Sequence, residues 1–213
     1  MITMKTTIPR EDILKQLIIQ LQSFFLVSED DKKMLADVFD NVLLRCEPNF
    51  TGTGKYFGQV PIFNPYHSVK YMMFLYTVSN ELFLKYGRNP LCDKVYYLNK
   101  IMNAVDMFYE IELPANWGAE HPVGSVLGRA KYGDGFFFYQ CCTVGGTTDK
   151  EGNIYYPVLE DNVRMFANSS ILGKCHIGKD VNIGAGCIVK NQDVPDNCTV
   201  FGQSPNLIIK KNK

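Results

Sequence analysis

The chain of 213 residues is 46% hydrophobic and 21% charged, which is ordinary for a protein that buries one large core or two small ones. Its 22 basic and 22 acidic residues balance, which excludes recognition of nucleic acid or of an anionic membrane through bulk charge. The apolar segments are too short to span a bilayer, and the seven scattered cysteines are typical of reduced thiols. We therefore expect a cytoplasmic protein without a membrane span.

Helical periodicity dominates the beginning of the chain. Apolar residues recur three and four positions apart between Leu14 and Phe25, which predicts an amphipathic helix. Ser28 has a side chain suited to the N-cap of a second helix. A loop rich in Gly, Pro and Asn is expected from Pro48 to Pro65. Within it, Thr51-Gly-Thr-Gly-Lys55 lacks the glycine spacing and the following Ser or Thr of a phosphate-binding loop, so it is interpreted as a turn.

Two further helices are predicted before the pattern changes. The third runs from about His67 to Tyr86, because the next residue is a glycine, which is favoured just after a helix. The fourth begins at Pro90, since proline suits the first helical position, and its apolar stripe continues to Phe108. We assign residues 1–109 to an α-helical domain.

A repeat of six residues replaces the helical pattern in residues 110–213. An apolar side chain recurs at every sixth position, and a mostly small residue follows it four positions later with the same period. Such a period suits a coil of triangular section, in which each side takes one hexapeptide and the apolar residue points inward. It predicts a parallel β-helix, and hence an α+β protein. The apolar positions are Val126, Tyr132, Phe138, Val144, Leu159, Met165, Ile171, Ile177, Ile183 and Val189.

The period is interrupted between Thr147 and Tyr156. A turn-like sequence there predicts a loop that leaves the coil at about residues 147–157. Loops on a rigid scaffold often carry functional residues, so this loop is a candidate part of a site.

Three segments of the coil are similar to segments of serine acetyltransferases. Residues 120–128, Glu-His-Pro-Val-Gly-Ser-Val-Leu-Gly, resemble that family's Asp-His-x-x-Gly-x-x-x-Gly segment, and residues 143–147 and 183–186 match its Thr-Leu-Gly-Gly-Thr and Ile-Gly-Ala-Gly segments. The resemblance covers residues from about 108 to 209. It implies a left-handed β-helix, acetyl-CoA as co-substrate, no metal, and a homotrimer or hexamer with a site between adjacent subunits.

By this resemblance His121 takes the place of the family's catalytic base. The chemistry agrees, because a hydroxyl group must lose its proton when it attacks a thioester, and histidine titrates near neutral pH. The family orients its histidine with a carboxylate that precedes a proline. Glu112 is our choice for this role, with Glu110 as the alternative, and Glu120 matches a family residue that contacts the acceptor.

Four small residues match the positions at which the family binds the pantetheine arm of acetyl-CoA. They are Gly146, Thr147, Ala167 and, one coil further on, Ala185. Small side chains let a long thin arm lie against backbone amides, and the amide of Gly146 is a candidate donor to the thioester oxyanion.

Tyr155 and Tyr156 replace the Arg-His pair with which the family holds the carboxylate of serine. Together with Trp117, these aromatic residues suit the apolar face of a sugar ring. The sequence therefore favours a sugar acceptor, as in relatives that accompany surface-polysaccharide synthesis. The alternative is a true serine acetyltransferase in which a lysine of the helical half, such as Lys55 or Lys70, replaces the lost arginine.

Other interpretations of the same residues remain open. A β-helix can serve as a trimeric scaffold without catalysis, and a zinc enzyme of the carbonic anhydrase type needs three histidines, whereas only His121 and His176 fall in the coil. His176 is expected at a solvated corner and His67 at the start of the third helix. Cys141 is expected to point outward beside the site and Cys142 to pack inside the coil.

Overall fold

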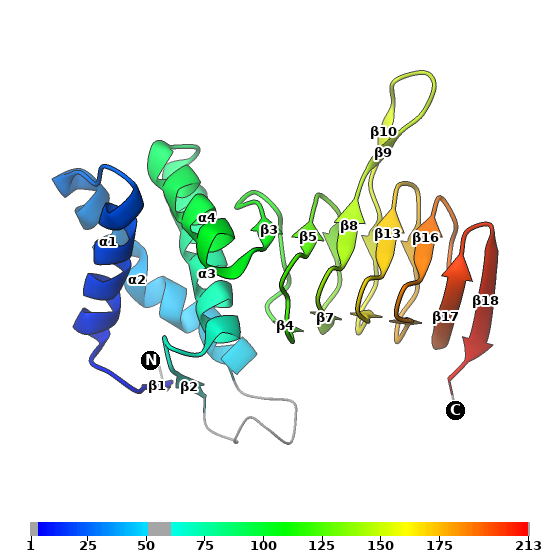
Figure 1. The fold of residues 1–213 in the computed structure, drawn as a ribbon, viewed down its shortest axis with the longest axis horizontal. Helices are drawn as coiled ribbons and strands as arrows, with labels where there is room; N and C mark the ends of the chain where they lie inside the picture. Colours follow the sequence, from blue (N-terminus) through cyan, green and yellow to red (C-terminus); the bar gives the residue numbers. More distant parts are fainter. Residues whose placement is uncertain (1–3, 51–60, 213) are drawn as a thin grey trace. The chain divides into compact units, whose positions relative to one another are not determined.

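The computed structural model describes residues 4–50 and 61–212 (Figure 1). It divides into two compact units, one up to Asn103 and one from Ala104 onward. Within the described residues, no helix is both long enough and apolar enough to cross a membrane. The turn considered at residues 51–55, with Lys55, lies outside the described residues.

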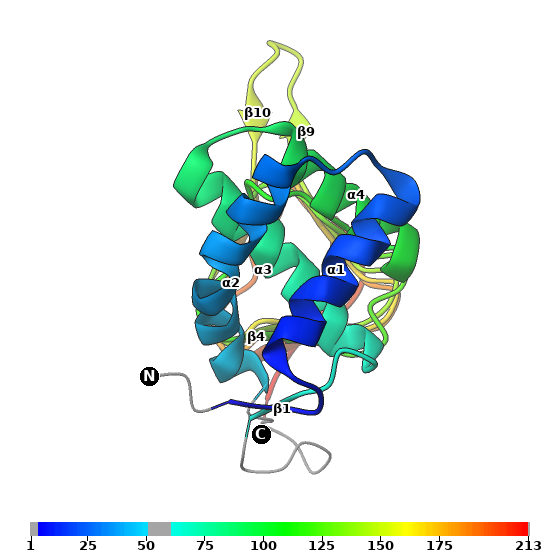
Figure 2. The same ribbon diagram turned by 90° about the vertical axis from the view of Figure 1, so that its left-hand side faces the viewer.

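The first unit is built from four helices, which are α1 Arg10–Phe24, α2 Glu29–Phe50, α3 Ser68–Tyr86 and α4 Pro90–Asn103 (Figure 2). The central element is α3, because residues 71–80 are all buried and α2 and α4 both pack against it. A short parallel pair, β1 Lys5–Thr6 with β2 Ile62–Phe63, completes this unit.

The starts of α2 and α3 follow from their capping residues. The hydroxyl of Ser28 accepts from the amide of Asp31 at 3.0 Å, and the carboxylate of Asp31 accepts from the amide of Ser28 at 3.0 Å. Such reciprocal capping satisfies backbone amides that have no partner inside the helix. His67 caps α3 by accepting from the amide of Lys70 at 3.4 Å, so this histidine has the structural role expected of it.

Two helix ends differ from the sequence prediction. Residues 48–50, which were expected in a loop, are helical, because α2 continues through Pro48 to Phe50, whose buried ring packs on Phe63 of strand β2 with centroids 5.2 Å apart. The fourth helix ends at Asn103, because Ala104 adopts a left-handed conformation with φ of 51°. The stripe to Phe108 is therefore not helical, and the second unit begins at residue 104, six residues before the expected boundary at 110.

The second unit is the expected left-handed parallel β-helix of hexapeptide repeats, with three faces (Figure 1). Strands of successive coils pair in parallel, so each inward side chain stacks on its equivalent in the next coil. Face 1 contains β3 Asp106–Met107, β5 Val126–Leu127, β8 Thr143–Gly145, β13 Ser170–Leu172 and β16 Ile188–Lys190; face 2 contains β6 Lys131–Tyr132, β11 Val158–Leu159 and β14 His176–Ile177; face 3 contains β4 Trp117–Ala119, β7 Phe136–Phe138, β12 Arg164–Met165, β15 Asn182–Ile183 and β17 Cys198–Gln203.

The last coil is closed by β18 Asn206–Lys211, which pairs with β17 in antiparallel fashion. Between β8 and β11 the chain leaves the coil as a hairpin of β9 Thr147–Thr148 and β10 Ile154–Tyr155, which projects from the coil in Figure 1. The carboxylate of Asp149 holds the hairpin tip by accepting from the amides of Glu151 and Asn153 at 3.0 and 2.8 Å.

Nine of the ten predicted inward positions are buried, and Val126 is the exception. Val126 is 41% exposed, whereas the next residue, Leu127, is buried and stacks on Val144. Leu127 lies five positions before the next inward residue, Tyr132, instead of six, and this shifts the inward position by one residue. The corner that precedes Val126 is in addition longer than the equivalent corners. That longer corner contains His121.

Candidate functional site

The candidate site begins with the corner between β4 and β5. Ala119 and Val126 are seven positions apart, whereas the residues that pair with them, Phe138 and Thr143, are five apart, so the corner holds two extra residues. They push His121 out of the coil: its side chain is 78% exposed and its φ is 51°. A histidine in a left-handed conformation is uncommon and is held here by the surrounding turn.

The base of this corner is fixed by a buried hydroxyl. Ser125 Oγ donates to the carbonyl of Tyr139 at 2.9 Å and accepts from the amide of Cys142 at 3.1 Å. The amide of Val123 donates to the carbonyl of His121 at 2.8 Å and tightens the turn. The backbone that carries the exposed imidazole is therefore held in place by hydrogen bonds.

Glu120 is the carboxylate that the described structure places beside the imidazole, with Oε1 3.9 Å from His121 Nε2. Glu110 instead faces Arg129, whose Nη2 lies 3.4 Å from its Oε2. Glu112, our choice for the orienting carboxylate, is exposed and makes no ion pair or hydrogen bond with His121 in the described part of the chain. Its role stays a prediction that the geometry does not support.

A row of outward side chains on face 3 continues from Glu120. Burial and the adjacent carboxylate of Glu120 raise the pKa of Tyr139, and the phenol shares a hydrogen bond with that carboxylate. The ring of Tyr139 stacks on Phe166 at 5.4 Å with an interplanar angle of 9°, and Phe137 contacts it edge-on at 5.4 Å. Arg164 lies over the Phe137 ring, with Cζ 5.2 Å from the centroid.

Two of the predicted acetyl-CoA residues lie at the same corner of the coil as His121. The amide of Asn168 donates to Gln140 and the amide of Gly186 donates to Ala167, so Ala167 and Ala185 occupy this corner in successive coils. Ala185 is exposed and Ala167 is half-buried.

The other two lie at the far end of face 1, where the hairpin leaves the coil. The ring of Tyr156 covers Gly146 so closely that a Cβ there would lie 2.8 Å from it. Thr147 Oγ1 donates to Asn191 Oδ1 at 3.2 Å. Within one chain, strand β8 separates this pair from the corner of His121.

The aromatic residues predicted to bind the acceptor are not gathered around His121. Trp117 is 6% exposed and its ring is parallel to that of Phe138 inside the coil, with centroids 6.4 Å apart, so it is a core residue and not part of an open pocket. Tyr155 lies under the ammonium of Lys174, 5.5 Å from the ring centroid. Lys70, considered as a replacement cation, donates to the carbonyl of Ile62 at 2.6 Å.

The remaining polar candidates have local roles. His176 Nε2 lies 3.1 Å from Glu160 Oε1 on face 2, and no group of three metal-binding side chains occurs among residues 4–50 and 61–212. Cys142 is buried, which raises the pKa of its thiol. Cys141 is exposed at the corner of His121, with Sγ 3.6 Å from the carbonyl of Val123.

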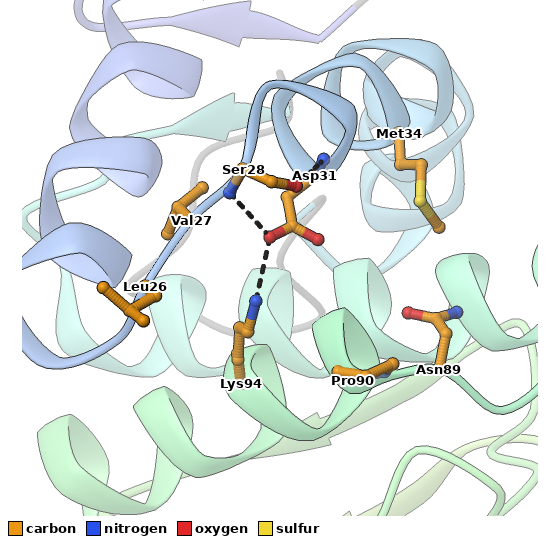
Figure 3. A pocket seen from close by; sticks show the side chains of 8 residues that line it. All are labelled: Leu26, Val27, Ser28, Asp31, Met34, Asn89, Pro90 and Lys94. Atoms are coloured by element: carbon orange, nitrogen blue, oxygen red, sulfur yellow. Dashed lines mark hydrogen bonds and ion pairs between the residues drawn. The ribbon is translucent and has the colours of Figure 1, made fainter.

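A hollow of about 450 Å³ lies in the helical unit, between the α1–α2 turn and the start of α4 (Figure 3). Its charged groups bind each other, since Lys94 Nζ lies 2.8 Å from Asp31 Oδ2. None of the predicted site residues lines it; its lining is Leu26, Val27, Ser28, Asp31, Met34, Asn89, Pro90 and Lys94.

Sequence reasoning placed neither Arg164 nor Tyr139 at the candidate site. A signal was present: Arg164 and Phe137 each precede an inward residue of the repeat, and Tyr139 and Phe166 each follow one. Residues beside the inward position must point outward, so the four side chains were predictable neighbours on one face.

Comparison with known proteins gives partial sequence matches to serine acetyltransferases. The chain is 36% identical to that of Synechococcus elongatus over 115 residues, which is 54% of this chain and 46% of that protein. It is 34% identical to that of Staphylococcus xylosus over 143 residues, 63% of this chain and 61% of that protein. The chain thus spans about half the length of the curated relatives it matches. No protein-family model matches the sequence.

Solved serine acetyltransferases share the whole fold. The structure from Vibrio cholerae superposes with a TM-score of 0.73 over 96% of this chain and 80% of that one, at 19% identity. The structure from Neisseria gonorrhoeae gives 0.70 over 92% and 77%, at 21% identity. A serine acetyltransferase solved in complex with CoA gives 0.70 over 94% and 84%, at 16% identity. The helical domain followed by a left-handed β-helix is therefore an established architecture.

Proposed function

We propose that the protein is an acetyl-CoA-dependent O-acetyltransferase with His121 as its catalytic base. The observation that carries this proposal is the longer corner between β4 and β5, which holds an exposed imidazole on a rigid base beside a carboxylate. The two-residue insertion distinguishes this corner from the equivalent corners of the following coils.

In the proposed reaction His121 accepts the proton of the acceptor hydroxyl as its oxygen attacks the thioester carbonyl. The C–S bond then breaks, the acetyl group remains on the oxygen, and the imidazolium returns its proton to the thiolate of CoA. Such a general base contributes roughly 10²–10⁴-fold to the rate. Because the thioester is already activated, no covalent acyl-enzyme is needed. Glu120 would stabilise the imidazolium, since its Oε1 lies 3.9 Å from Nε2.

The corner of Ala167 and Ala185 is the proposed path of the pantetheine arm. Its small side chains leave room for a thin ligand beside the backbone, and it runs along the coil from the position of His121. Support comes from the fold neighbour solved in complex with CoA. Gly146 and Thr147, which lie across face 1, would contact the same molecule only from an adjacent subunit, as the resemblance implies for a trimer.

L-Serine is the acceptor that we propose. The sequence favoured a sugar, but the relatives found in the comparison are named serine acetyltransferases, and a solved neighbour is a complex with serine. The structure also removes an argument for the sugar, because Trp117 is buried in the core. The link to surface-polysaccharide synthesis has no support in these comparisons.

The test is the release of free CoA thiol from acetyl-CoA with L-serine and with a panel of hydroxylated sugars. We expect saturable turnover with L-serine, and a loss of at least about a hundredfold in the His121→Ala variant. The His176→Ala variant is the matched control and should keep normal turnover, because His176 bonds Glu160 on another face. Better turnover with a sugar than with L-serine would show that the acceptor is a sugar. Normal activity of His121→Ala would show that His121 is not the catalytic base.

A further inference from the structure

Arg164 is an exposed arginine without a carboxylate partner in the described part of the chain. Two other cations of the β-helix do face carboxylates: Arg129 faces Glu110 at 3.4 Å and Lys179 faces Asp161 at 3.5 Å. The contact made by the guanidinium of Arg164 is with the ring of Phe137, with Cζ 5.2 Å from its centroid. A planar cation stacked on an aromatic face keeps its N–H donors available to an anion.

The packing of face 3 directs this cation toward β4, the strand that leads into the corner of His121. Arg164 pairs in register with Phe137, and Phe137 pairs with Gly118, one strand spacing of about 4.8 Å per coil. Gly118 has no side chain, so the Phe137 ring lies against its backbone, 2.8 Å from where a Cβ would stand. The ring thus leans toward β4, and the guanidinium follows it.

Opposite charges therefore flank one surface beside the imidazole. Glu120 lies on one side, 3.9 Å from His121 Nε2, and the Tyr139 ring lies between Glu120 and the Phe137–Arg164 pair, 5.4 Å from Phe137. A free amino acid is a zwitterion whose ammonium and carboxylate require opposite partners. Tyr155 and Tyr156 stand where the resemblance implies a cationic pair, so an acceptor with a carboxylate requires another cation.

We propose that Arg164 is the residue that binds the carboxylate of the acceptor, with Glu120 binding its ammonium group and His121 facing its hydroxyl. This assignment rests on the proposed function and narrows the acceptor to hydroxylated amino acids. Arginine suits the role because its planar fork matches a carboxylate with two parallel hydrogen bonds. The neighbouring Phe137 fixes the plane of the fork, which is the reason for an aromatic residue at this outward position.

The experiment compares L-serine with L-serinamide, which keeps the hydroxyl and the ammonium group but lacks the carboxylate charge. In Arg164→Gln, the KM for L-serine should rise about tenfold to a hundredfold, the range of a lost charged hydrogen bond. The kcat/KM for L-serinamide and the KM for acetyl-CoA should stay unchanged. Arg164→Lys should raise the KM for L-serine less than Arg164→Gln does, because lysine keeps the positive charge but cannot form the two parallel hydrogen bonds of a guanidinium. Lys179→Gln is the matched control and should leave all constants unchanged.

Three results would overturn the assignment: unchanged KM for L-serine in Arg164→Gln, equal losses with both acceptors, or a raised KM for acetyl-CoA, which would place the cation on the CoA phosphates. Calorimetric binding of L-serine, with no acetyl-CoA present, separates this assignment from the proposed function. The wild-type protein could bind L-serine more tightly than Arg164→Gln does and yet transfer no acetyl group. That result would support the role of Arg164 and reject the proposed acetyltransferase activity. Wild type that binds no L-serine would reject the role of Arg164.

Discussion

The three histidines of the chain occupy surroundings that assign each a different role. His67 accepts the amide of Lys70 at the start of α3, and burial followed by the nearby Lys70 charge lowers its pKa. His176 bonds Glu160 on the side of a regular coil. Only His121 stands on an inserted corner with a free path to solvent. The inserted corner and the backbone conformation, rather than residue type, distinguish the candidate base.

Tyr139 gives a prediction about pH. Burial and then the charge of Glu120 raise its pKa, so its phenolate should appear above the ordinary value near 10. The stabilisation from the Tyr139–Glu120 contact is therefore complete below that ordinary value and is lost as the pH rises through the raised pKa. Ultraviolet titration of wild type minus Tyr139→Phe isolates this group. Glu120→Gln should move the difference curve to lower pH, and an unmoved curve would show that Glu120 does not act on the phenol.

Cys141 gives a prediction about thiol reactivity. It is exposed, whereas the other six cysteines are buried, and burial raises the pKa of Cys46 to about 12 and that of Cys187 to about 11. Because the thiolate is the reactive form, a disulfide reagent should label one thiol rapidly in the native protein. Cys141→Ser should abolish this fast phase. Two or more fast thiols would mean that the coil opens more readily than its packing implies.

The capping of α2 can be tested by a single substitution. Ser28→Ala removes the hydroxyl that accepts from the amide of Asp31, and it should cost about 1 kcal/mol of unfolding free energy. Ser23→Ala is the matched control, because the hydroxyl of Ser23 donates to the carbonyl of Ile19 within α1 and caps no helix start, so its loss should change the free energy by less than about 0.5 kcal/mol. Chemical denaturation measures both, and equal losses would contradict the capping role.

Acid should weaken the same helix start. Burial alone would raise the pKa of Asp31, but hydrogen bonds from Lys94 and Ser28 outweigh it and lower the pKa. The stabilisation is thus present above the unfolded value near 4 and is lost as the pH falls through the lowered pKa.

The repeat made the β-helix predictable because a period of six residues maps directly onto one side of the coil. Strictly repeated positions such as Ile171 and Ile177 are buried as expected. The period could not reveal where the coil departs from it. A step of five residues from Leu127 to Tyr132 moved the inward position from Val126 to Leu127. Trp117, on the strand before the corner of His121, is buried in the core. Side chains beside the site were therefore harder to predict than the scaffold that carries them.

The site itself was predictable only where a local motif carried it. Glu120 and His121 are adjacent in sequence, so their proximity could be predicted without knowing the fold. Arg164 reaches the same surface from two coils away through register pairing with Phe137. Such a contact follows from how strands align, which composition and motif spacing do not specify.

Assembly is the property that joins the separated parts of the site. His121 and the Ala167–Ala185 corner lie apart from Gly146 and Thr147 within one chain, and the resemblance implies that adjacent subunits bring such surfaces together. We therefore expect light scattering to give about three times the chain mass of 24.2 kDa, or six times if the helical domains pair. Outward aromatic residues such as Phe137 provide apolar area for the contact.

Dilution tests whether the assembly is needed for activity. If each site uses residues of two subunits, dissociation of the subunits separates the two parts of the site. Specific activity should then fall at the same protein concentration at which the mass measured by light scattering falls. Acetyl-CoA should oppose this loss, because a ligand that binds only the assembled site shifts the equilibrium toward the assembly. The two curves are compared at constant salt and temperature with L-serine saturating. A monomer that keeps full specific activity would show that one β-helix holds a complete site, and Gly146 and Thr147 would then lose their proposed role in binding acetyl-CoA.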